Sequence, residues 1–416
     1  MMHRMNAPES SLPVIDRRFR QDPRERVFFD DPWRLYRELH RIGGPLRWED
    51  YDLWCLAGFD AVNGALRDRR FRRLPPIGHE SAPWPPHLAD FALAERHSLL
   101  ALEPPDHTRL RKLVNRAFVS RQVRRMAPGI RALADHFIER IEADGAAELI
   151  EAWATPIPVT VIARLIGVPD EERDDLLAWS HAMVKVYTLT QTREEELAAN
   201  AAAKAFRERL LALIAEKRRR PADDLISHLL ALRNLETPLE DDAIVSVAIL
   251  LLNAGHEATV HQLGNAVRTL LSRAPGAEPA SALFATAART EATVAELLRH
   301  DAPLHLFIRH AQEDVPLGDG VTLARGERVA LLLGAANRDP ARFADPDAFD
   351  PARTDGAHVT LGGGIHYCVG AQLAKLELGI ALGALFERLP AIRLDGEPRC
   401  RDSYHFHGLE ALRVRW

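Results

Sequence analysis

The spacing of apolar residues predicts helices over most of the chain. Apolar positions recur every three or four residues, the period of a helix with one buried face. The predicted helices cover residues 32–39, 108–117, 123–143, 157–165, two stretches within 171–220, 239–271 and 293–299. A short strand is expected at 51–56, and after Pro303 the pattern changes to short apolar runs separated by Gly and Pro, typical of strands and turns. We therefore expect a mainly α fold with a minor β portion.

The same pattern bears on domain organisation. No long linker, low-complexity tract or repeat interrupts residues 31–416, so we expect one large domain there. Residues 1–30 are polar and rich in Arg, Asp and Pro, and we expect that segment to be partly disordered or extended. Residues 72–94 lose the helical period and contain Pro, Gly, Trp and His, which predicts a long irregular loop of the kind that carries function.

Composition narrows the class of protein. The 416 residues are 47% hydrophobic, enough for a large core, and the net charge of −5 without a dominant basic block argues against a nucleic-acid partner. The longest strongly apolar run, 244–252, is too short to span a bilayer, and the N-terminal segment has no apolar core like that of a signal peptide. We expect a soluble, cytoplasmic protein with no membrane partner.

One of the three cysteines stands in a distinctive setting. Cys368 lies in a glycine-rich run, Leu361-Gly-Gly-Gly-Ile-His-Tyr-Cys-Val-Gly370, directly before a helical stretch. The unpaired N–H groups and the positive dipole at a helix start favour a thiolate, the form that binds metal. A lone thiolate of this kind suits an axial ligand to haem iron, while a buried structural cysteine is the alternative. With no C-x-x-C pair, the chain is not expected to hold a zinc ribbon, an iron–sulfur cluster or a disulfide framework.

This run resembles the haem-binding loop of the cytochrome P450 superfamily, and the resemblance to its soluble bacterial members extends from about residue 31 to the C-terminus. The matching positions are Gly364, His366, Cys368 and Gly370, with Gly362 in the same run. Leu361 departs from the family's usual Phe. The resemblance implies the cytochrome P450 fold, with a large helical region, a small β-rich region and haem b (iron protoporphyrin IX) between the long central helix and the cysteine loop. Cys368 would be the iron ligand and the glycines part of the cofactor site.

Further motifs occur in the family's order. Glu296 and Arg299 lie three apart on a predicted helix and resemble the family's Glu-x-x-Arg motif, with Arg353 as the third partner of a structural triad. A bare exposed ion pair is the alternative. The remaining matches imply contacts to the haem propionates, at His107, Arg111, Arg309 and His366.

The centre of the long helix, 254–259, resembles the family's oxygen-binding groove. Gly255 is expected to permit a local bulge. Glu257 matches the acid of a proton relay, and Ala258 occupies the place of the usual Thr. Thr259 carries a hydroxyl, but one step along a helix turns it by about 100°, so an undistorted helix is expected to aim it elsewhere. We therefore hypothesise that ordered water or a polar group of the substrate completes the relay.

The resemblance also implies a substrate pocket. Its candidate lining includes the connection near residues 187–191 and these residues: Trp84, Leu251, Ala254, Leu306, Phe307 and His405. Most are apolar, which predicts a small, mainly apolar organic substrate. A metal pair of His405 with His407 lacks a third ligand in the sequence, so we favour a turn that lines the pocket.

The resemblance implies a haem-thiolate monooxygenase that activates dioxygen. The sequence has no convincing dinucleotide fingerprint, so electrons are expected to come from separate proteins. The resemblance to soluble members of the family implies that these are a ferredoxin and a reductase, with NAD(P)H acting only indirectly. Arg109, Lys112 and Lys375 form a candidate basic patch for that acidic donor. The alternatives are a hydrogen peroxide-driven peroxygenase, because the relay is altered, and a haem-binding sensor without turnover.

Overall fold

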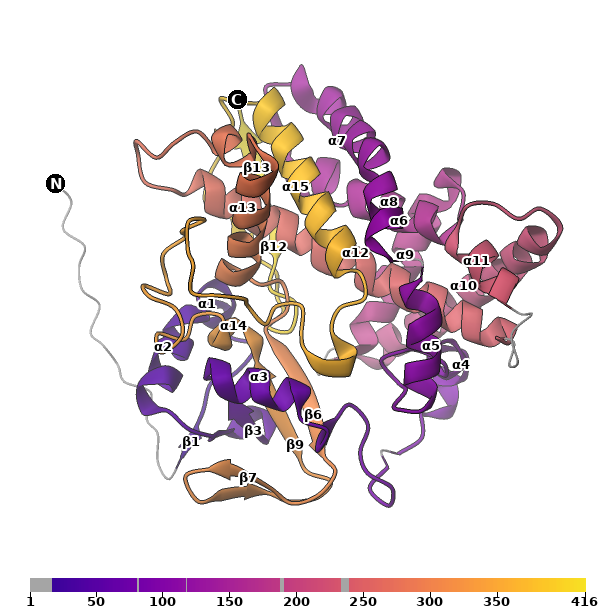
Figure 1. Ribbon diagram of the computed structural model, residues 1–416, viewed down its shortest axis with the longest axis vertical. Coiled ribbons are helices and arrows are strands. Elements are labelled where there is room, and N and C mark those ends of the chain that lie inside the picture. The colour runs from indigo at the N-terminus through magenta and orange to yellow at the C-terminus, as the bar shows by residue number, and fades with distance from the viewer. Residues whose placement is uncertain (1–16, 81, 117, 188–190, 233–238) are drawn as a thin grey trace.

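The fold is a large helical body with a sheet at one end, as a computed structural model shows (Figure 1). The structure describes residues 17–80, 82–116, 118–187, 191–232 and 239–416. The helices are α1 Arg26–Asp30, α2 Trp33–Ile42, α3 Phe59–Arg67, α4 Ala89–Glu95, α5 Asp106–Asn115, α6 Ser120–Arg125, α7 Ala127–Glu142, α8 Pro156–Ile166, α9 Arg173–Val184, α10 Arg193–Arg219, α11 Leu225–Ala231, α12 Asp241–Leu271, α13 Ala287–His300, α14 Leu333–Ala336 and α15 Ala371–Arg388.

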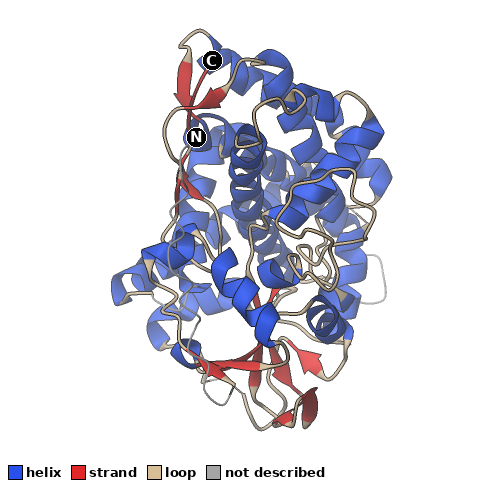
Figure 2. Ribbon diagram, turned by 90° about the vertical axis from the view of Figure 1, so that its left-hand side faces the viewer, coloured by secondary structure: helices blue, strands red, loops and turns tan. Residues whose placement is uncertain are grey.

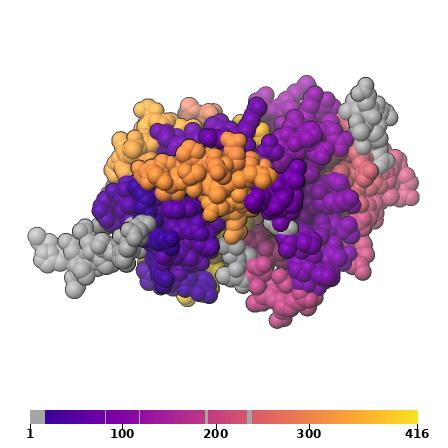
Figure 3. Space-filling model, turned by 90° about the horizontal axis from the view of Figure 1, so that it is seen from below, coloured from indigo at the N-terminus to yellow at the C-terminus, as the bar shows by residue number. Residues whose placement is uncertain are grey.

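The strands are short and gather at two ends of the molecule (Figure 2). They are β1 Arg18–Phe19, β2 Leu46–Trp48, β3 Leu53–Leu56, β4 Phe71–Arg72, β5 Ala146–Glu148, β6 Leu306–Ala311, β7 Val315–Gly318, β8 Val321–Leu323, β9 Arg328–Leu332, β10 Arg393–Leu394, β11 Arg399–Cys400, β12 Leu409–Ala411 and β13 Arg413–Arg415. The main sheet has the order β1-β2-β3-β9-β6-β4, and β10-β13-β5 form a smaller one. The β7–β8 hairpin, orange in Figure 3, crosses the face formed by the N-terminal part of the chain.

The two faces of strand β6 carry different side chains. It pairs antiparallel with β9, with Phe307 opposite Leu331 and Arg309 opposite Val329. Because side chains alternate along a strand, Phe307 and Arg309 share one face and Leu306 lies on the other. This alternation sends one face of β6 towards the helical body, where the candidate site lies.

Helix α12 runs through the middle of the helical body and packs against α8, α4, α9 and α15. In the described part of the chain it is the one helix long and apolar enough to cross a membrane, but 83% of its apolar window is buried inside the protein. Burial on all sides explains its near-continuous hydrophobicity, as expected for a core helix. Ile244, Ile249 and Leu252 are fully buried in its first half.

The predicted mainly α fold with a minor β portion is confirmed, and two local expectations are wrong. The 72–94 stretch is not irregular throughout, because it contains most of α4, whose Phe91 and Ala94 are buried. Helix α12 continues through Gly255 without a bulge. A Cβ at Gly255 would lie 3.1 Å from Ile162 Cγ1, so this glycine serves the close approach of α8.

The N-terminal segment is only partly described. Residues 1–16 lie outside the described residues, whereas residues 17–30 contain β1 and α1, with Phe19, Phe28 and Phe29 buried in the core. A domain boundary at residue 30 stays a prediction.

Candidate active site

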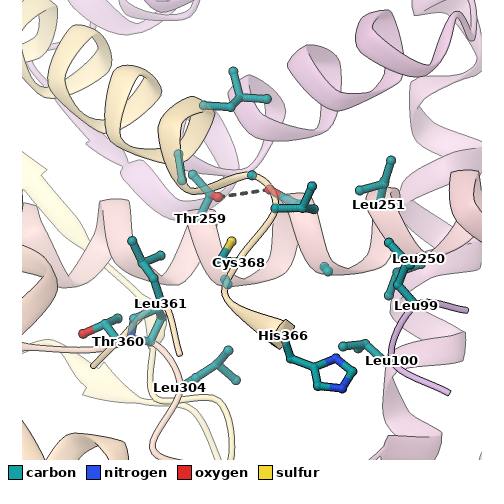
Figure 4. Close-up of a pocket in the computed structure, with 18 of the residues that line it drawn as sticks. Leu99, Leu100, Leu250, Leu251, Thr259, Leu304, Thr360, Leu361, His366 and Cys368 are labelled. Carbon is teal, nitrogen blue, oxygen red and sulfur yellow. Dashed lines mark hydrogen bonds between the residues drawn. The ribbon is translucent and has the colours of Figure 1, made fainter. Parts of the chain in front are cut away.

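A cavity opens where α12, α5, β6 and the cysteine loop meet (Figure 4). The space between its walls is about 1440 Å³, its opening to solvent included. Its walls are largely apolar, with Leu251, Ala254 and Phe307 of the predicted substrate pocket among them.

Three other predicted pocket residues do not line this cavity. Trp84 is 48% exposed and packs its ring against Phe91, while His405 lies outside the lining. Leu306 is buried on the opposite face of β6 from Phe307, as strand alternation requires. In the predicted connection at 187–191, residues 188–190 lie outside the described residues.

The cysteine loop owes its shape to its glycines. Gly362 and Gly364 have φ of 72° and 63°, the left-handed region that other residues adopt at a cost. A Cβ at Gly364 would also meet the Leu66 carbonyl oxygen at an impossible 2.4 Å, so the loop lies directly against the end of α3. The Cys368 amide donates to the Leu361 carbonyl at 2.9 Å, which closes the loop and turns the sulfur towards the cavity.

The protonation state of Cys368 differs from what the helix start alone predicts, which is a thiolate. Burial raises its pKa, and the Gly370 amide and the Arg111 guanidinium only oppose that effect. Burial therefore favours the neutral thiol, and a bound cation is needed to stabilise the thiolate. Gly370, whose amide faces the sulfur, also lines the cavity.

Four predicted cofactor contacts come together around the cavity from three segments of the chain. His107 and Arg111 lie on α5, Arg309 on β6 and His366 in the cysteine loop, and all four line the same space. Burial lowers the pKa of His107 to about 4 and that of Arg309 to about 10. Their surroundings disfavour the charged forms of these side chains. A bound anion would stabilise those charged forms, as expected of an anion-binding site.

Their acid partners are largely missing among the described residues. Neither ring nitrogen of His107 has a hydrogen-bond partner, and Arg309 donates only to the Ile308 carbonyl. Arg111 donates to the Tyr367 carbonyl and to the Asn115 side chain, not to a carboxylate. His366 approaches Glu103, at 3.6 Å between Nε2 and Oε1. The set therefore has more positive charge than the described chain neutralises.

Three ionisable residues in or beside the cavity were not predicted from the sequence. Arg73 lines it and donates through Nε to the Leu100 carbonyl, and Glu103 binds the Arg73 amide at 2.9 Å. Glu377 on α15 is buried with an unpartnered Oε1, and burial raises its pKa to about 8. Arg73 and Glu103 lie in segments without periodicity, so no sequence pattern marks them. The helical position of Glu377, nine residues after Cys368, was the only available signal.

The cavity-facing side of α12 is a stripe two residues wide. Its members follow the helical spacing i, i+1, i+4, i+5, i+8, i+9 and i+12: Leu250, Leu251, Ala254, Gly255, Ala258, Thr259 and Gln262. Thr259 therefore lines the cavity beside Ala258, and the expectation that it points elsewhere is wrong. Its hydroxyl donates to the Gly255 carbonyl at 3.0 Å, the dashed line in Figure 4.

Glu257 lies off that stripe and does not line the cavity. Its Oε1 accepts from Arg401 at 2.9 Å and lies 3.2 Å from His261 Nε2. Its Oε2 lies 3.5 Å from His181 and 3.4 Å from His256. Burial alone raises the pKa of Glu257, but these imidazole contacts outweigh it and hold the pKa well below its usual range.

The predicted triad forms away from the cavity, with all its charges paired. Glu296 takes two bonds from Arg299, each at 2.7 Å, and lies 3.4 Å from Arg353. Arg299 also donates to the carbonyls of Asn337, Pro346 and Ala348. The cluster ties α13 to the segment that leads into the cysteine loop.

Known proteins resemble this chain over most of its length. A family model described as Cytochrome P450 matches residues 278–393. Cytochrome P450 107B1 of Saccharopolyspora erythraea is 39% identical over 377 residues, 88% of this chain and 89% of the relative. The chain belongs to the cytochrome P450 family. Cytochrome P450 monooxygenase PikC of Streptomyces venezuelae is 35% identical over 402 residues, 94% of this chain and 92% of the relative. The crystal structure of P450BioI, in complex with a hexadec-9Z-enoic acid ligated acyl carrier protein, matches with a TM-score of 0.85 and 33% identity, over 94% of this chain and 100% of that one.

Family membership confirms the general activity and implies the cofactor. This cytochrome P450 is a monooxygenase that uses dioxygen to oxidise an organic substrate, and the family implies haem. The cavity fits a haem on two observations. A single sulfur faces it, and the imidazole and guanidinium groups around it lack the acids that two propionates supply.

Proposed function

We propose that this monooxygenase holds haem b through Cys368 and oxidises a small, mainly apolar substrate in the space beneath α12. The observation that carries the proposal is the convergence of one sulfur and four under-neutralised cationic or imidazole groups on one apolar cavity. When bound, the haem supplies the iron at which dioxygen is activated for transfer of one oxygen atom to the substrate. The chain itself binds the haem and the substrate, orients the substrate and excludes water.

Cys368 would bind the iron as a thiolate, and His107, Arg111, Arg309 and His366 would bind the propionates. Replacing Cys368 by His keeps a ligand atom but removes the sulfur. The C368H protein is expected to retain some haem yet lose the thiolate-type Soret band of its reduced carbon monoxide complex. Cys55 is buried away from the cavity, so C55A is the matched control and keeps the band. An unchanged band in C368H would contradict the assignment.

The apolar walls support a substrate with little charge. Leu251, Ala254 and Phe307 give no hydrogen bond to a ligand through their side chains, so binding there rests on apolar contact. A screen for compounds that displace water from the haem iron, read as a spectral shift, identifies the substrate class. Preference for strongly anionic compounds would contradict this part of the proposal.

We also propose that protons reach the oxygen through water or through a polar group of the substrate. The Thr259 hydroxyl donates its hydrogen bond to the Gly255 carbonyl, so towards the cavity its oxygen can only accept hydrogen bonds. The Ala258 methyl group exchanges no proton, and Glu257 is turned away from the cavity. A proton donor to the reacting oxygen must therefore come from outside these three side chains.

The test is the amount of product formed per NAD(P)H consumed. We expect T259A to keep most of the wild-type coupling with the native substrate. With an analogue that lacks the polar group, A258T should couple at least as well as the wild type does. Severe uncoupling in T259A, together with full coupling of that analogue in the wild type, would assign the relay to Thr259 and contradict the proposal.

Electrons would come from a ferredoxin and its NAD(P)H-dependent reductase, in the cytoplasm. Arg109 and Lys112 are exposed on α5 beside the cysteine loop, where Ile365 and Tyr367 are also exposed, 51% and 40% respectively. Exposed cations around apolar side chains suit an acidic donor. K112E is expected to raise the KM for the ferredoxin in a salt-dependent way, whereas K204E on helix α10 is not.

A reconstituted redox chain distinguishes the three functions expected from the sequence. A monooxygenase consumes NAD(P)H in proportion to substrate. A peroxygenase forms product from hydrogen peroxide alone at a comparable rate, and a sensor forms none. Product that depends on NAD(P)H and the ferredoxin is the result we expect.

A further inference from the structure

The side of α12 that faces away from the cavity carries a second polar cluster, shared with α9. Glu257 and His256 belong to α12 and His181 to α9. The two oxygens of Glu257 have separate surroundings. Arg401 and His261 contact Oε1, whereas His181 and His256 face Oε2. The monooxygenase reaction does not account for the second group of contacts.

His256 is the reason to expect a ligand here. Its side chain is fully buried, and its Nδ1 lies 2.9 Å from the Leu252 carbonyl oxygen, which only accepts hydrogen bonds. Nδ1 therefore carries the ring proton, and in the neutral ring Nε2 holds a lone pair. That Nε2 has no hydrogen-bond partner in the described part of the chain and lies 3.4 Å from Oε2 of the Glu257 carboxylate. Two buried lone-pair-bearing atoms at this separation require a cation or a second proton to stabilise them.

The distances suit a metal ion of the zinc class. Zinc lies about 2.0–2.1 Å from His nitrogen and carboxylate oxygen, so ligand atoms of a tetrahedral site are separated by about 3.4 Å. The separations from Oε2 are 3.4 Å to His256 and 3.5 Å to His181, and the three ligand atoms all lie within 4.8 Å of one another. His181 has 46% of its side chain exposed, so its ring has room to rotate and close the longest separation.

We propose that His181, His256 and Glu257 form a binding site for a divalent transition-metal ion, with zinc as the best fit. Two imidazoles and one carboxylate favour zinc and its neighbours over Mg²⁺ and Ca²⁺, which prefer oxygen ligands. Three protein ligands leave a fourth position open towards solvent on the His181 side. The bound ion joins α9 to α12 and holds Oε2 of Glu257.

The charges around the site set its affinity. Arg401 lies 2.9 Å from the other oxygen of Glu257 and opposes a cation, although 44% of its side chain is exposed and therefore screened by water. His261 is buried beside the same oxygen. The only carboxylate of the site is thus partly neutralised, which predicts weaker binding than in a structural zinc site. Removing the Arg401 charge is expected to strengthen binding.

The test is calorimetric titration with Zn²⁺ of the tag-free holoprotein, from which bound metal ions other than the haem iron have first been removed. We expect one saturable site per chain, weakened at least about tenfold in H181A. The matched control is H87A, because His87 pairs with Glu196 at 2.7 Å without a third ligand in the described chain, and its loss should leave the site intact. R401A should bind Zn²⁺ more tightly than the wild type. Equal binding by the wild type and H181A, or no saturable binding by the wild type, would overturn the proposal.

Zinc-edge X-ray absorption of the loaded protein gives a second readout that the iron does not obscure. We expect nitrogen and oxygen neighbours alone at about 2.0–2.1 Å, including imidazole. A sulfur neighbour near 2.3 Å would place the zinc on a cysteine and overturn the assignment. Both readouts are independent of catalysis, so they do not depend on the proposed cofactor contacts.

Discussion

Two pairs of arginines in this protein, each with one buried and one half-buried member, have opposite surroundings. Arg299 and Arg353 meet Glu296 and several backbone carbonyls, so their charges are paired within the chain. Arg309 and Arg111 meet carbonyls or an amide oxygen instead of a carboxylate. A buried charge is stable only when it is paired. The difference in partners therefore separates arginines that stabilise the fold from arginines that are available to bind an anionic ligand.

The largest effect is expected at the paired group. E296A leaves the buried Arg299 guanidinium without its acid, while Arg353 keeps its ion pair with Asp355, and it should lower the free energy of unfolding by about 3–5 kcal/mol. Glu291 lies exposed on the same helix, so E291A should change it by less than about 0.5 kcal/mol. Chemical denaturation measures both. Equal, small losses in the two variants would remove the structural role of the triad.

The next effect tests an unpaired acid that lines the cavity. Burial raises the pKa of Glu377 to about 8, above its unfolded value near 4.5. Such a group contributes stability that is fully present below the unfolded pKa and is lost as pH rises through the folded one. The wild type should therefore lose a few kcal/mol of stability relative to E377Q between about pH 4.5 and pH 8. Parallel stability curves for the two proteins would contradict a neutral, buried Glu377.

The smallest effect concerns Leu361, which lines the cavity where the family usually has Phe. An aromatic ring there changes packing and solvent access beside the sulfur, and both factors tune the haem potential. L361F should shift the reduction potential measured by spectroelectrochemistry while the unfolding transition stays the same. An identical potential would make the position a packing site only.

The local features of the site were predictable, because short-range spacing determines them. The glycine run places Cys368 before a helix, and a four-residue spacing puts His107 and Arg111 on one face of α5. The Glu296–Arg299 pair, three apart, follows the same rule. In each case the helix period determines the geometry without help from the rest of the fold.

What depends on long-range packing was not predictable. Which side of α12 faces the cavity depends on how the helix packs against its neighbours, and both Ala258 and Thr259 lie on that side, contrary to the expectation for Thr259. Glu103 meets His366 across 263 residues of chain, in a segment without periodicity. Leu306 was assigned to the pocket because sequence alone does not tell which face of a strand is turned inwards.

The most direct test of the difference between the two groups is to measure haem release and unfolding on the same variant, R309Q. If Arg309 serves the cofactor, transfer of haem to excess apomyoglobin should speed up by the equivalent of about 1.5–3 kcal/mol, while the free energy of unfolding of the haem-free protein stays equal or rises. The reverse result, unchanged haem release with a loss of stability like that of E296A, would show that Arg309 belongs to the fold and would contradict the separation.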